Sequence, residues 1–143
     1  MKILSALKQL VSGEPLREHH PVRTEALIVE DNPDEMAYLS GLLRFQKALV
    51  TQAFSIVGAL EAIAKPTDYQ IAFIDLNLKD GSGIEVIRRI KEAKRMTHAV
   101  VVSGDWEKLP LILSYGYIAL LPKPYTMDSV REILEKHRLP CAY

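Results

Sequence analysis

Short apolar runs alternate with segments of helical periodicity along most of the chain. The runs have strand length and lie at residues 26–29, 48–54, 71–74, 99–102 and 117–121. Strands that are apolar throughout are buried on both faces, which is typical of a parallel sheet covered by helices. The alternation therefore predicts five βα units, (βα)5, in a doubly wound α/β domain with a five-stranded parallel sheet.

Helix-start signals follow the first of these runs. Asn32 is a capping residue, Pro33 suits the first helical position, and Glu35 is an acid that could close a capping box. The next helical segment is marked by the apolar residues Ile56, Val57, Leu60, Ile63 and Ala64. Pro110 interrupts the fourth helical segment, so this helix is expected to start late or to be distorted.

The N-terminal segment has an apolar stripe of its own at helical spacing. The stripe consists of Ile3, Leu4, Leu7, Leu10 and Val11. We expect an amphipathic helix and linker over residues 1–24, one domain over residues 25–137 and a short tail over residues 138–143. The helix could pack on the domain, mediate a homodimer or another partner contact, or touch a membrane surface. Lys2 and Lys8 would give only weak membrane attraction.

Composition is that of one soluble globular domain: 143 residues, 48% hydrophobic and 25% charged. Lys plus Arg equals Asp plus Glu at 18 each, so no global basic field suggests a nucleic-acid partner. The single cysteine, Cys141, cannot form an internal disulfide and fits a reducing compartment. No apolar run approaches the roughly 20 residues needed to span a membrane. We expect a cytoplasmic protein that does not enter a membrane.

Polar and charged side chains follow four of the predicted strands. Glu30 and Asp31 follow the first, Asp75 the third, Ser103 the fourth and Lys123 the fifth. Ligands of a doubly wound sheet bind beyond the carboxyl ends of its strands. A lone acid there is more often a helix cap or a solvated turn. Three acids, a hydroxyl and a lysine on four strand ends indicate a shared site.

This constellation resembles the response-regulator receiver domain of two-component signalling, over residues 25–137. The sequences "IVEDN", "FIDLNLKDGSG", "VVVSGD" and "LLPKPY" match its acidic pair, phosphoacceptor loop, hydroxyl site and Lys-Pro pair. Each motif is weak alone, but together they occur in the family's order and spacing. The resemblance implies a flavodoxin-like fold with strand order 2-1-3-4-5.

The resemblance also implies roles for the residues at the strand ends. Asp75 would be the nucleophile that becomes an aspartyl phosphate. Ser103 would donate its hydroxyl to the phosphoryl group, and Lys123 would pair with a phosphoryl oxygen. The bond between Lys123 and Pro124 is usually cis in this family.

A Mg²⁺ ion is the implied cofactor. Asp31, Asp75 and the backbone carbonyl of Asn77 would bind it, with Glu30 acting through water. Mg²⁺ prefers carboxylates, phosphate oxygens and retained waters, which suits such an open acidic site. Mg²⁺ and Lys123 would offset the repulsion between a carboxylate and an incoming phosphate.

The implied function is that of a single-domain response regulator. Its partners would be a histidine kinase or a histidine phosphotransfer protein and an unknown downstream protein. The signal would leave by protein–protein contact or by a phosphorelay. The chain would catalyse only its own phosphorylation and dephosphorylation, and we expect no enzyme activity on an external metabolite.

Departures from the family pattern leave alternatives open. Leu120 stands where the family's switch has an aromatic residue, and Tyr117 falls on the opposite face of the strand. With Pro110, this keeps open a pseudo-receiver that binds partners without phosphorylation. An aspartate-nucleophile phosphohydrolase would need a second acid at position 77, where the chain has Asn77. Lys79 replaces a proline that many members have.

Overall fold

The computed structural model describes residues 4, 7, 11–13, 23–93, 96–105, 107, 110, 112 and 119–137. Its main feature is a five-stranded parallel sheet of order β2-β1-β3-β6-β7. The strands are β1 (Glu25–Val29), β2 (Leu49–Ala53), β3 (Ile71–Asp75), β6 (His98–Ser103) and β7 (Ala119–Pro122). Counted along the chain, this is the order 2-1-3-4-5, so the expected flavodoxin-like (βα)5 arrangement is confirmed.

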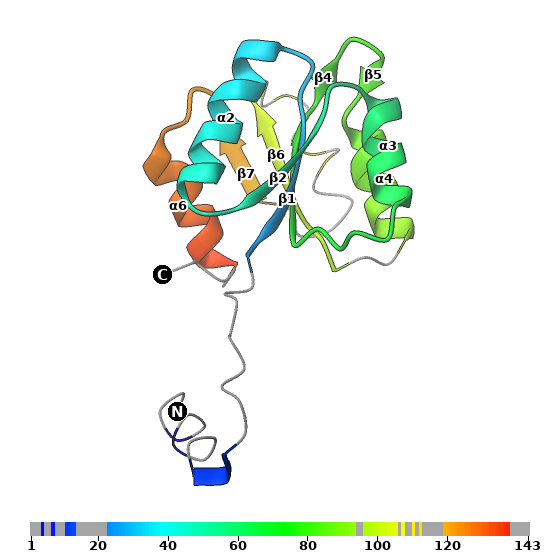
Figure 1. Cartoon of the computed structure of the whole chain (residues 1–143). Helices are drawn as coiled ribbons and strands as arrows, with labels where there is room; N and C mark the ends of the chain where they lie inside the picture. The colour runs from blue at the N-terminus through cyan, green and yellow to red at the C-terminus, as the bar shows by residue number, and fades with distance from the viewer. Residues whose placement is uncertain are drawn as a thin grey trace.

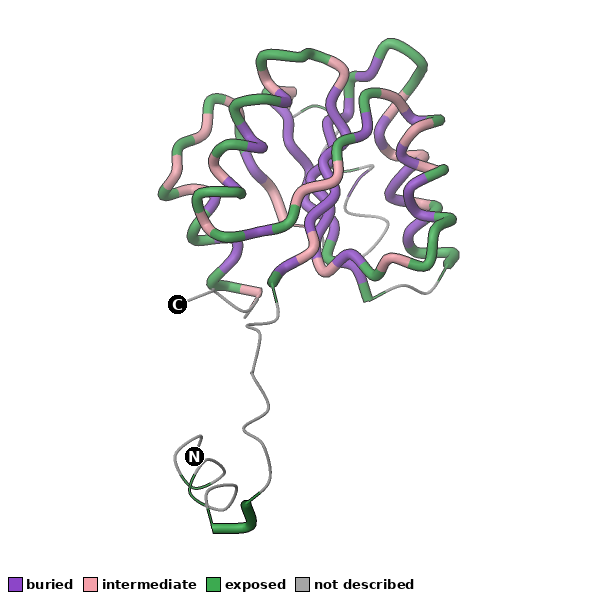
Figure 2. Tube along the Cα trace, in the orientation of Figure 1, coloured by how far each residue is buried: buried purple, intermediate pink, exposed green. Residues whose placement is uncertain are grey.

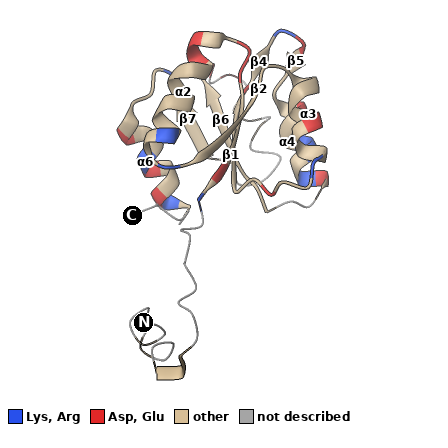
Figure 3. Cartoon of the chain, in the orientation of Figure 1, with Lys and Arg blue, Asp and Glu red and all other residues tan. Residues whose placement is uncertain are grey.

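Helices cover both faces of the sheet. The helices α2 (Pro33–Phe45) and α6 (Met127–Lys136) lie on one face, and α3 (Ile56–Ala64) and α4 (Ile84–Glu92) lie on the other (Figure 1). No helix in the described part of the chain is long and apolar enough to cross a membrane. Acidic and basic side chains are interspersed over these helices (Figure 3), in keeping with the balanced charge of the sequence.

Two apolar cores form because successive residues of a strand point to opposite faces of the sheet. Leu27 and Val29 of β1 join the core under α3 and α4. Ala26 and Ile28 of the same strand join the core under α2 and α6. Every residue of β3 is buried, and Figure 2 shows the central strands as the most continuously buried part of the chain. The continuous apolar runs of the sequence are therefore the strands between two helical layers.

Local signals set the helix starts. Asn32 Oδ1 accepts hydrogen bonds from the backbone N–H groups of Asp34 and Glu35, which caps α2 as predicted. The capping-box role expected for Glu35 is wrong. The side chain that accepts the N–H of Asn32 is Glu30, at 3.0 Å, and this leaves the Glu35 carboxylate available elsewhere.

Val57, one of the apolar residues that mark α3 in the sequence, is 62% exposed. It lies in the first turn of α3, where the inward positions are Ile56, Ala59, Ala62 and Ile63. A nine-residue helix on one side of a sheet has a narrow buried face, and Val57 falls outside it.

Only parts of the other predicted helices belong to the described residues. Pro110 and Ile112 are helical, with Pro110 exposed and Ile112 buried in the core. Leu4, Leu7 and Val11 are helical, as their spacing predicted, and their side chains are exposed. Most of the linker within residues 1–24, and all of residues 138–143, lie outside the described residues. The proposed boundaries and the alternatives for the N-terminal helix stay predictions.

Candidate functional site

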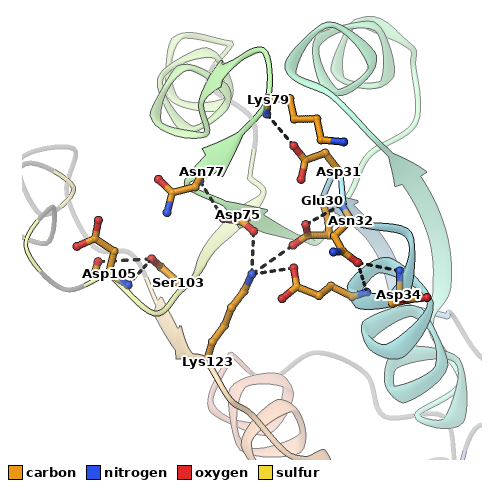
Figure 4. A network of polar contacts seen from close by, with 11 residues as sticks. Glu30, Asp31, Asn32, Asp34, Asp75, Asn77, Lys79, Ser103, Asp105 and Lys123 are labelled. Atoms are coloured by element: carbon orange, nitrogen blue, oxygen red, sulfur yellow. Dashed lines mark hydrogen bonds and ion pairs between the residues drawn. The ribbon is translucent and has the colours of Figure 1, made fainter.

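The carboxyl ends of three parallel strands bring one lysine and two buried carboxylates together. Lys123 follows β7, and its Nζ lies 2.8 Å from Asp75 Oδ2 at the end of β3. The same Nζ lies 3.5 Å from Oε2 of Glu30, which follows β1. Figure 4 shows the lysine reaching across to both acids. Three of the strand-end residues predicted to share a site, Glu30, Asp75 and Lys123, therefore do so, at the edge where a doubly wound sheet binds ligands.

Backbone amides fix both acidic side chains in place. Asp75 Oδ1 accepts the N–H of Asn77 at 2.9 Å, and Glu30 Oε1 accepts the N–H of Asn32 at 3.0 Å. The side chains of Glu30 and Asp75 are only 6% and 7% exposed. Each carboxylate thus has one oxygen held by the backbone and the other facing Lys123. The peptide bond between Lys123 and Pro124 is cis, as the resemblance implied.

Burial and charge change the acid–base properties of this cluster. Burial raises the pKa of Glu30 to about 8, helped by its hydrogen bond to Asp75 and by the charge of that residue. The N–H of Asn32 and the charge of Lys123 only partly oppose this rise in pKa. For Lys123, burial alone would lower the pKa, but hydrogen bonds and charges from Asp75, Glu35 and Glu30 raise it above its usual range. Lys123 is therefore a permanent cation here.

A third acid, which the sequence analysis did not include in the site, also contacts Lys123. Glu35, in the first turn of α2, places Oε2 3.1 Å from Lys123 Nζ, and its side chain is 44% exposed. Carboxylate oxygens of Glu30, Glu35 and Asp75 lie within 4.8 Å of one another, the one such group of potential metal ligands among the described residues. One feature of the sequence could have indicated Glu35: it lies in the first turn of the helix that begins directly after the acidic residues at the end of the first strand.

Asp31 lies beside this group and contacts the loop that follows the acceptor strand. That loop folds as a hairpin of β4 (Asn77–Leu78) and β5 (Gly81–Ser82). Asp31 Oδ2 accepts the backbone N–H of Lys79 at 2.7 Å (Figure 4). A proline at position 79 would lack this donor. The structure thus places Asp31 at the hairpin, outside the group of acids that surrounds Lys123.

The tip of the same hairpin is anchored on α3. Both carboxylate oxygens of Asp80 accept the N–H of Ile56, at 3.0 and 3.1 Å, where α3 begins. A carboxylate is favourable at a helix N-terminus because it satisfies free N–H groups and the helix dipole. The backbone that carries Asn77 is therefore held on both sides, by Asp31 and by α3.

Ser103 is in place at the end of β6, but its hydroxyl is engaged within its own loop. Its Oγ accepts the N–H of Asp105 at 2.9 Å (Figure 4). The Ser103 carbonyl accepts the N–H of Lys123 at 3.1 Å, which ties the ends of β6 and β7 together. The structure thus positions Ser103 beside the lysine without a direct contact between its hydroxyl and Asp75 among the described hydrogen bonds.

Comparison with known proteins decides the family. The sequence model of the response regulator receiver domain matches residues 26–135. The chain belongs to this family. The matched residues contain the strands of the sheet, apart from Glu25, and every strand-end residue described above.

Relatives of this receiver domain include larger regulators. The response regulator protein PilR of Pseudomonas aeruginosa is 27% identical over 114 residues, which cover 78% of this chain and 25% of PilR. The sensory transduction protein LytR of Staphylococcus epidermidis is 26% identical over 114 residues, covering 78% of this chain and 45% of LytR. The chain thus spans less than half the length of these relatives.

Solved receiver structures share the fold along their full length. A CheY-like receiver domain from Methylobacillus flagellatus is 28% identical, with a TM-score of 0.74 over 80% of this chain and 98% of that one. The receiver domain of the sensor histidine kinase PA1611 from Pseudomonas aeruginosa is 22% identical, with a TM-score of 0.72 over 80% and 97% of the two chains. The latter structure has a magnesium ion coordinated in its active site cleft.

Leu120 is a departure from the family pattern that bears on the switch and lies within the described residues. Leu120, at the position of the family's switch aromatic, packs against the core under α3 and α4. Tyr117 lies outside the described residues. An atypical switch in this receiver domain stays a prediction.

The raised pKa of Glu30 predicts how the stability of the metal-free receiver domain depends on pH. An unfolded glutamate releases its proton near pH 4.5, whereas folded Glu30 keeps its proton up to about pH 8. The folded state therefore binds the additional proton between these values, and the free energy of unfolding falls as pH rises through this window. The contribution of one proton is at most about 1.4 kcal/mol per pH unit.

Urea unfolding in EDTA, at intervals from pH 5 to pH 8, measures this effect. Glu30→Gln is the matched variant, because a glutamine can still accept the N–H of Asn32 but does not titrate. We expect the free energy of unfolding of the wild type to fall steadily relative to that of Glu30→Gln as pH rises. A difference that is independent of pH would contradict the assignment to Glu30.

Proposed function

We propose that this receiver domain accepts a phosphoryl group on Asp75 from a histidine kinase or a histidine phosphotransfer protein. The observation that carries the proposal is the 2.8 Å contact between Lys123 Nζ and Asp75 Oδ2, beside buried Glu30. A permanent cation at the acceptor carboxylate attracts a phosphoryl oxygen to the place where transfer occurs. An ion pair with a purely structural role would not need to lie at the edge of the sheet where ligands bind.

The transfer breaks the P–N bond of the phosphohistidine and forms a P–O bond to Asp75. The electron pair of the broken bond stays on the imidazole nitrogen, which takes up a proton. Repulsion between the carboxylate and the phosphoryl oxygens opposes the step, and Lys123 reduces this repulsion. Ser103 donates its hydroxyl to a phosphoryl oxygen once its O–H turns away from the carbonyl of Asp105, which lies 3.4 Å from Oγ.

The acidic residues fit a Mg²⁺ ion, which we propose as the cofactor. Three carboxylates meet within 4.8 Å. Burial raises the pKa of Glu30, and the neighbouring Asp75 raises it further even though Lys123 is close, so the negative charge of these acids exceeds the single positive charge of the lysine. Asp31, Asp75 and the backbone carbonyl of Asn77 would hold the ion, with Glu30 acting through water. When bound, Mg²⁺ supplies positive charge to the phosphoryl oxygens.

The output of the domain follows from the same proposal. A domain of this kind signals by protein–protein contact with a downstream protein or passes the phosphoryl group on in a phosphorelay. It acts on its own Asp75 and not on an external metabolite. Several expectations stay predictions. They are that the protein has a single domain, that it is cytoplasmic, that it has no nucleic-acid or membrane partner, and that the N-terminal helix mediates a homodimer.

One alternative function has a specific observation in its favour. A pseudo-receiver would use the same fold to bind partners without phosphorylation, and Leu120 in place of the family's aromatic residue is compatible with it. The complete set of Asp75, Lys123 and Ser103 favours phosphorylation. A phosphohydrolase is disfavoured because Asn77 cannot act as the second acid.

Labelling with radioactive acetyl phosphate, with and without Mg²⁺, tests the proposal. We expect about one label per chain with Mg²⁺ and none in EDTA, and we expect mass spectrometry to locate the label on Asp75. Multiple turnover of the donor without retained label would indicate a hydrolase. No label under any condition would support the pseudo-receiver.

A further inference from the structure

The ammonium group of Lys123 is surrounded by three carboxylates in the resting protein. Its Nζ donates hydrogen bonds to Asp75 at 2.8 Å and to Glu35 at 3.1 Å, and it forms an ion pair with Glu30 at 3.5 Å. A lysine ammonium has three N–H donors and no acceptor. A phosphoryl oxygen that binds Lys123 therefore competes with these carboxylates for the donors.

The three carboxylates differ in how firmly they are held. Asp75 and Glu30 are buried, and each has its second oxygen on a backbone N–H. Glu35 is 44% exposed at the mouth of the site, and Lys123 is the partner of its carboxylate in the described hydrogen bonds. Glu35 can move into water at little cost, whereas Glu30 would leave an N–H group unsatisfied. The phosphoryl group should therefore displace Glu35.

The helix start explains why Glu35 is available for this contact. An acid at this position commonly turns back to the N–H of the capping residue. Here Glu30 accepts the Asn32 N–H, so that bond is already made. The Glu35 side chain instead extends to Lys123, 88 residues away in the sequence. The contact therefore depends on the pairing of Glu30 with the helix cap.

We propose that Glu35 is a positioning residue that occupies the phosphoryl-oxygen place on Lys123 in the resting state and so limits phosphoryl uptake. The inference rests on the proposed function of Asp75. Two effects act in the same direction: Glu35 competes for the ammonium, and its negative charge lies within 4.8 Å of the acceptor carboxylate. Loss of that charge should favour the phosphorylated state without any new contact.

Binding of beryllofluoride, a phosphoryl mimic, measures this effect apart from the rate of any donor. The probe is titrated at saturating Mg²⁺ by fluorine NMR on wild type and on Glu35→Gln, which keeps the size of the side chain. We expect roughly tenfold tighter binding to the variant, because the half-exposed Glu35 charge is screened to a strength between that of a pair in bulk water and that of a pair near a protein surface. Asp34→Asn is the matched control, because it removes an exposed acid from the same turn that does not contact Lys123.

Two further measurements separate a positioning role from other roles of Glu35. The NMR chemical shifts of the side-chain carbons and nitrogen of Lys123 should change in Glu35→Gln before any beryllofluoride is added. They should stay unchanged in Asp34→Asn. The Mg²⁺ dissociation constant should rise in Glu35→Gln by no more than the loss of one nearby charge implies, which is up to about tenfold. A hundredfold loss of Mg²⁺ affinity would make Glu35 a metal ligand and overturn the inference.

The remaining outcomes distinguish failure of the inference from failure of the proposed function. Equal or weaker beryllofluoride binding by Glu35→Gln, with normal binding by wild type, would overturn the role of Glu35 alone. An equal gain in Asp34→Asn would also overturn it, because overall charge would then explain the effect. Absence of beryllofluoride binding by wild type would overturn both proposals.

Discussion

Asp75→Asn is expected to abolish labelling by acetyl phosphate in the presence of Mg²⁺. The amide nitrogen and oxygen of asparagine carry no negative charge and are far weaker nucleophiles than a carboxylate. Glu30 is not expected to replace Asp75, because it is buried, with one oxygen on the N–H of Asn32 and the other beside Lys123. Glu35 is exposed and hydrated. The expected loss is complete within detection.

The fold should survive this substitution. Asparagine keeps an oxygen that can accept the N–H of Asn77, as Oδ1 of Asp75 does at 2.9 Å. Lys123 keeps Glu35 and Glu30 as partners. Because the cluster holds more acid than base, loss of one carboxylate should change the free energy of unfolding by no more than about 1–2 kcal/mol. Loss of label would then report chemistry and not unfolding.

Circular dichroism and urea unfolding check the fold, and scintillation counting of the protein band checks the label. Asp128→Asn is the control, since it removes one exposed carboxylate from α6 and should label like wild type. Wild-type labelling of Asp75→Asn would remove Asp75 from its role and the proposed function with it.

The parallel sheet and the shared site were predictable from short-range patterns, and the strand order was implied by the family resemblance. An apolar run such as residues 71–74 has strand length and indicates a strand buried on two faces, and parallel strands bring their ends to one edge. Asp75 and Lys123 were therefore placed together correctly from residues 48 positions apart. The burial that raises the pKa of Glu30 follows from the same topology.

Features that depend on competition between neighbouring groups were not predictable. Glu35 satisfies a sequence rule for a capping box, but Glu30 takes the bond that the rule assigns to it. The outcome depends on the approach of the β1 end to the helix start, which is a tertiary property. The exposure of Val57 has a related cause: apolar spacing marks the helix, but the contact with the sheet decides how wide its buried face is.

The backbone at the end of β3 depends on Gly83, the last residue of the phosphoacceptor-loop motif. A Cβ atom on Gly83 would lie 2.1 Å from the carbonyl oxygen of Asp75 and 2.8 Å from Cγ2 of Ile74. The Gly83 backbone is in the ordinary right-handed helical region, so the constraint is space and not conformation. The N–H of Gly83 also donates to the carbonyl of Leu76 at 3.0 Å. Gly83 thus permits the close contact between the start of α4 and the acceptor strand.

Gly83→Ala is accordingly expected to destabilise the domain by about 2–4 kcal/mol, because a backbone oxygen cannot move aside as a flexible side chain can. Gly41→Ala is the matched control: a Cβ there meets nothing within 4 Å, and alanine is favoured in a helix by up to about 1 kcal/mol. Urea unfolding midpoints compare the two. Since relief of the clash must displace the Asp75 backbone from Lys123, labelling by acetyl phosphate should fall in Gly83→Ala under conditions where it is still folded. Equal stability of the two variants would show that the acceptor strand tolerates this movement, and the close packing would then have no part in positioning Asp75.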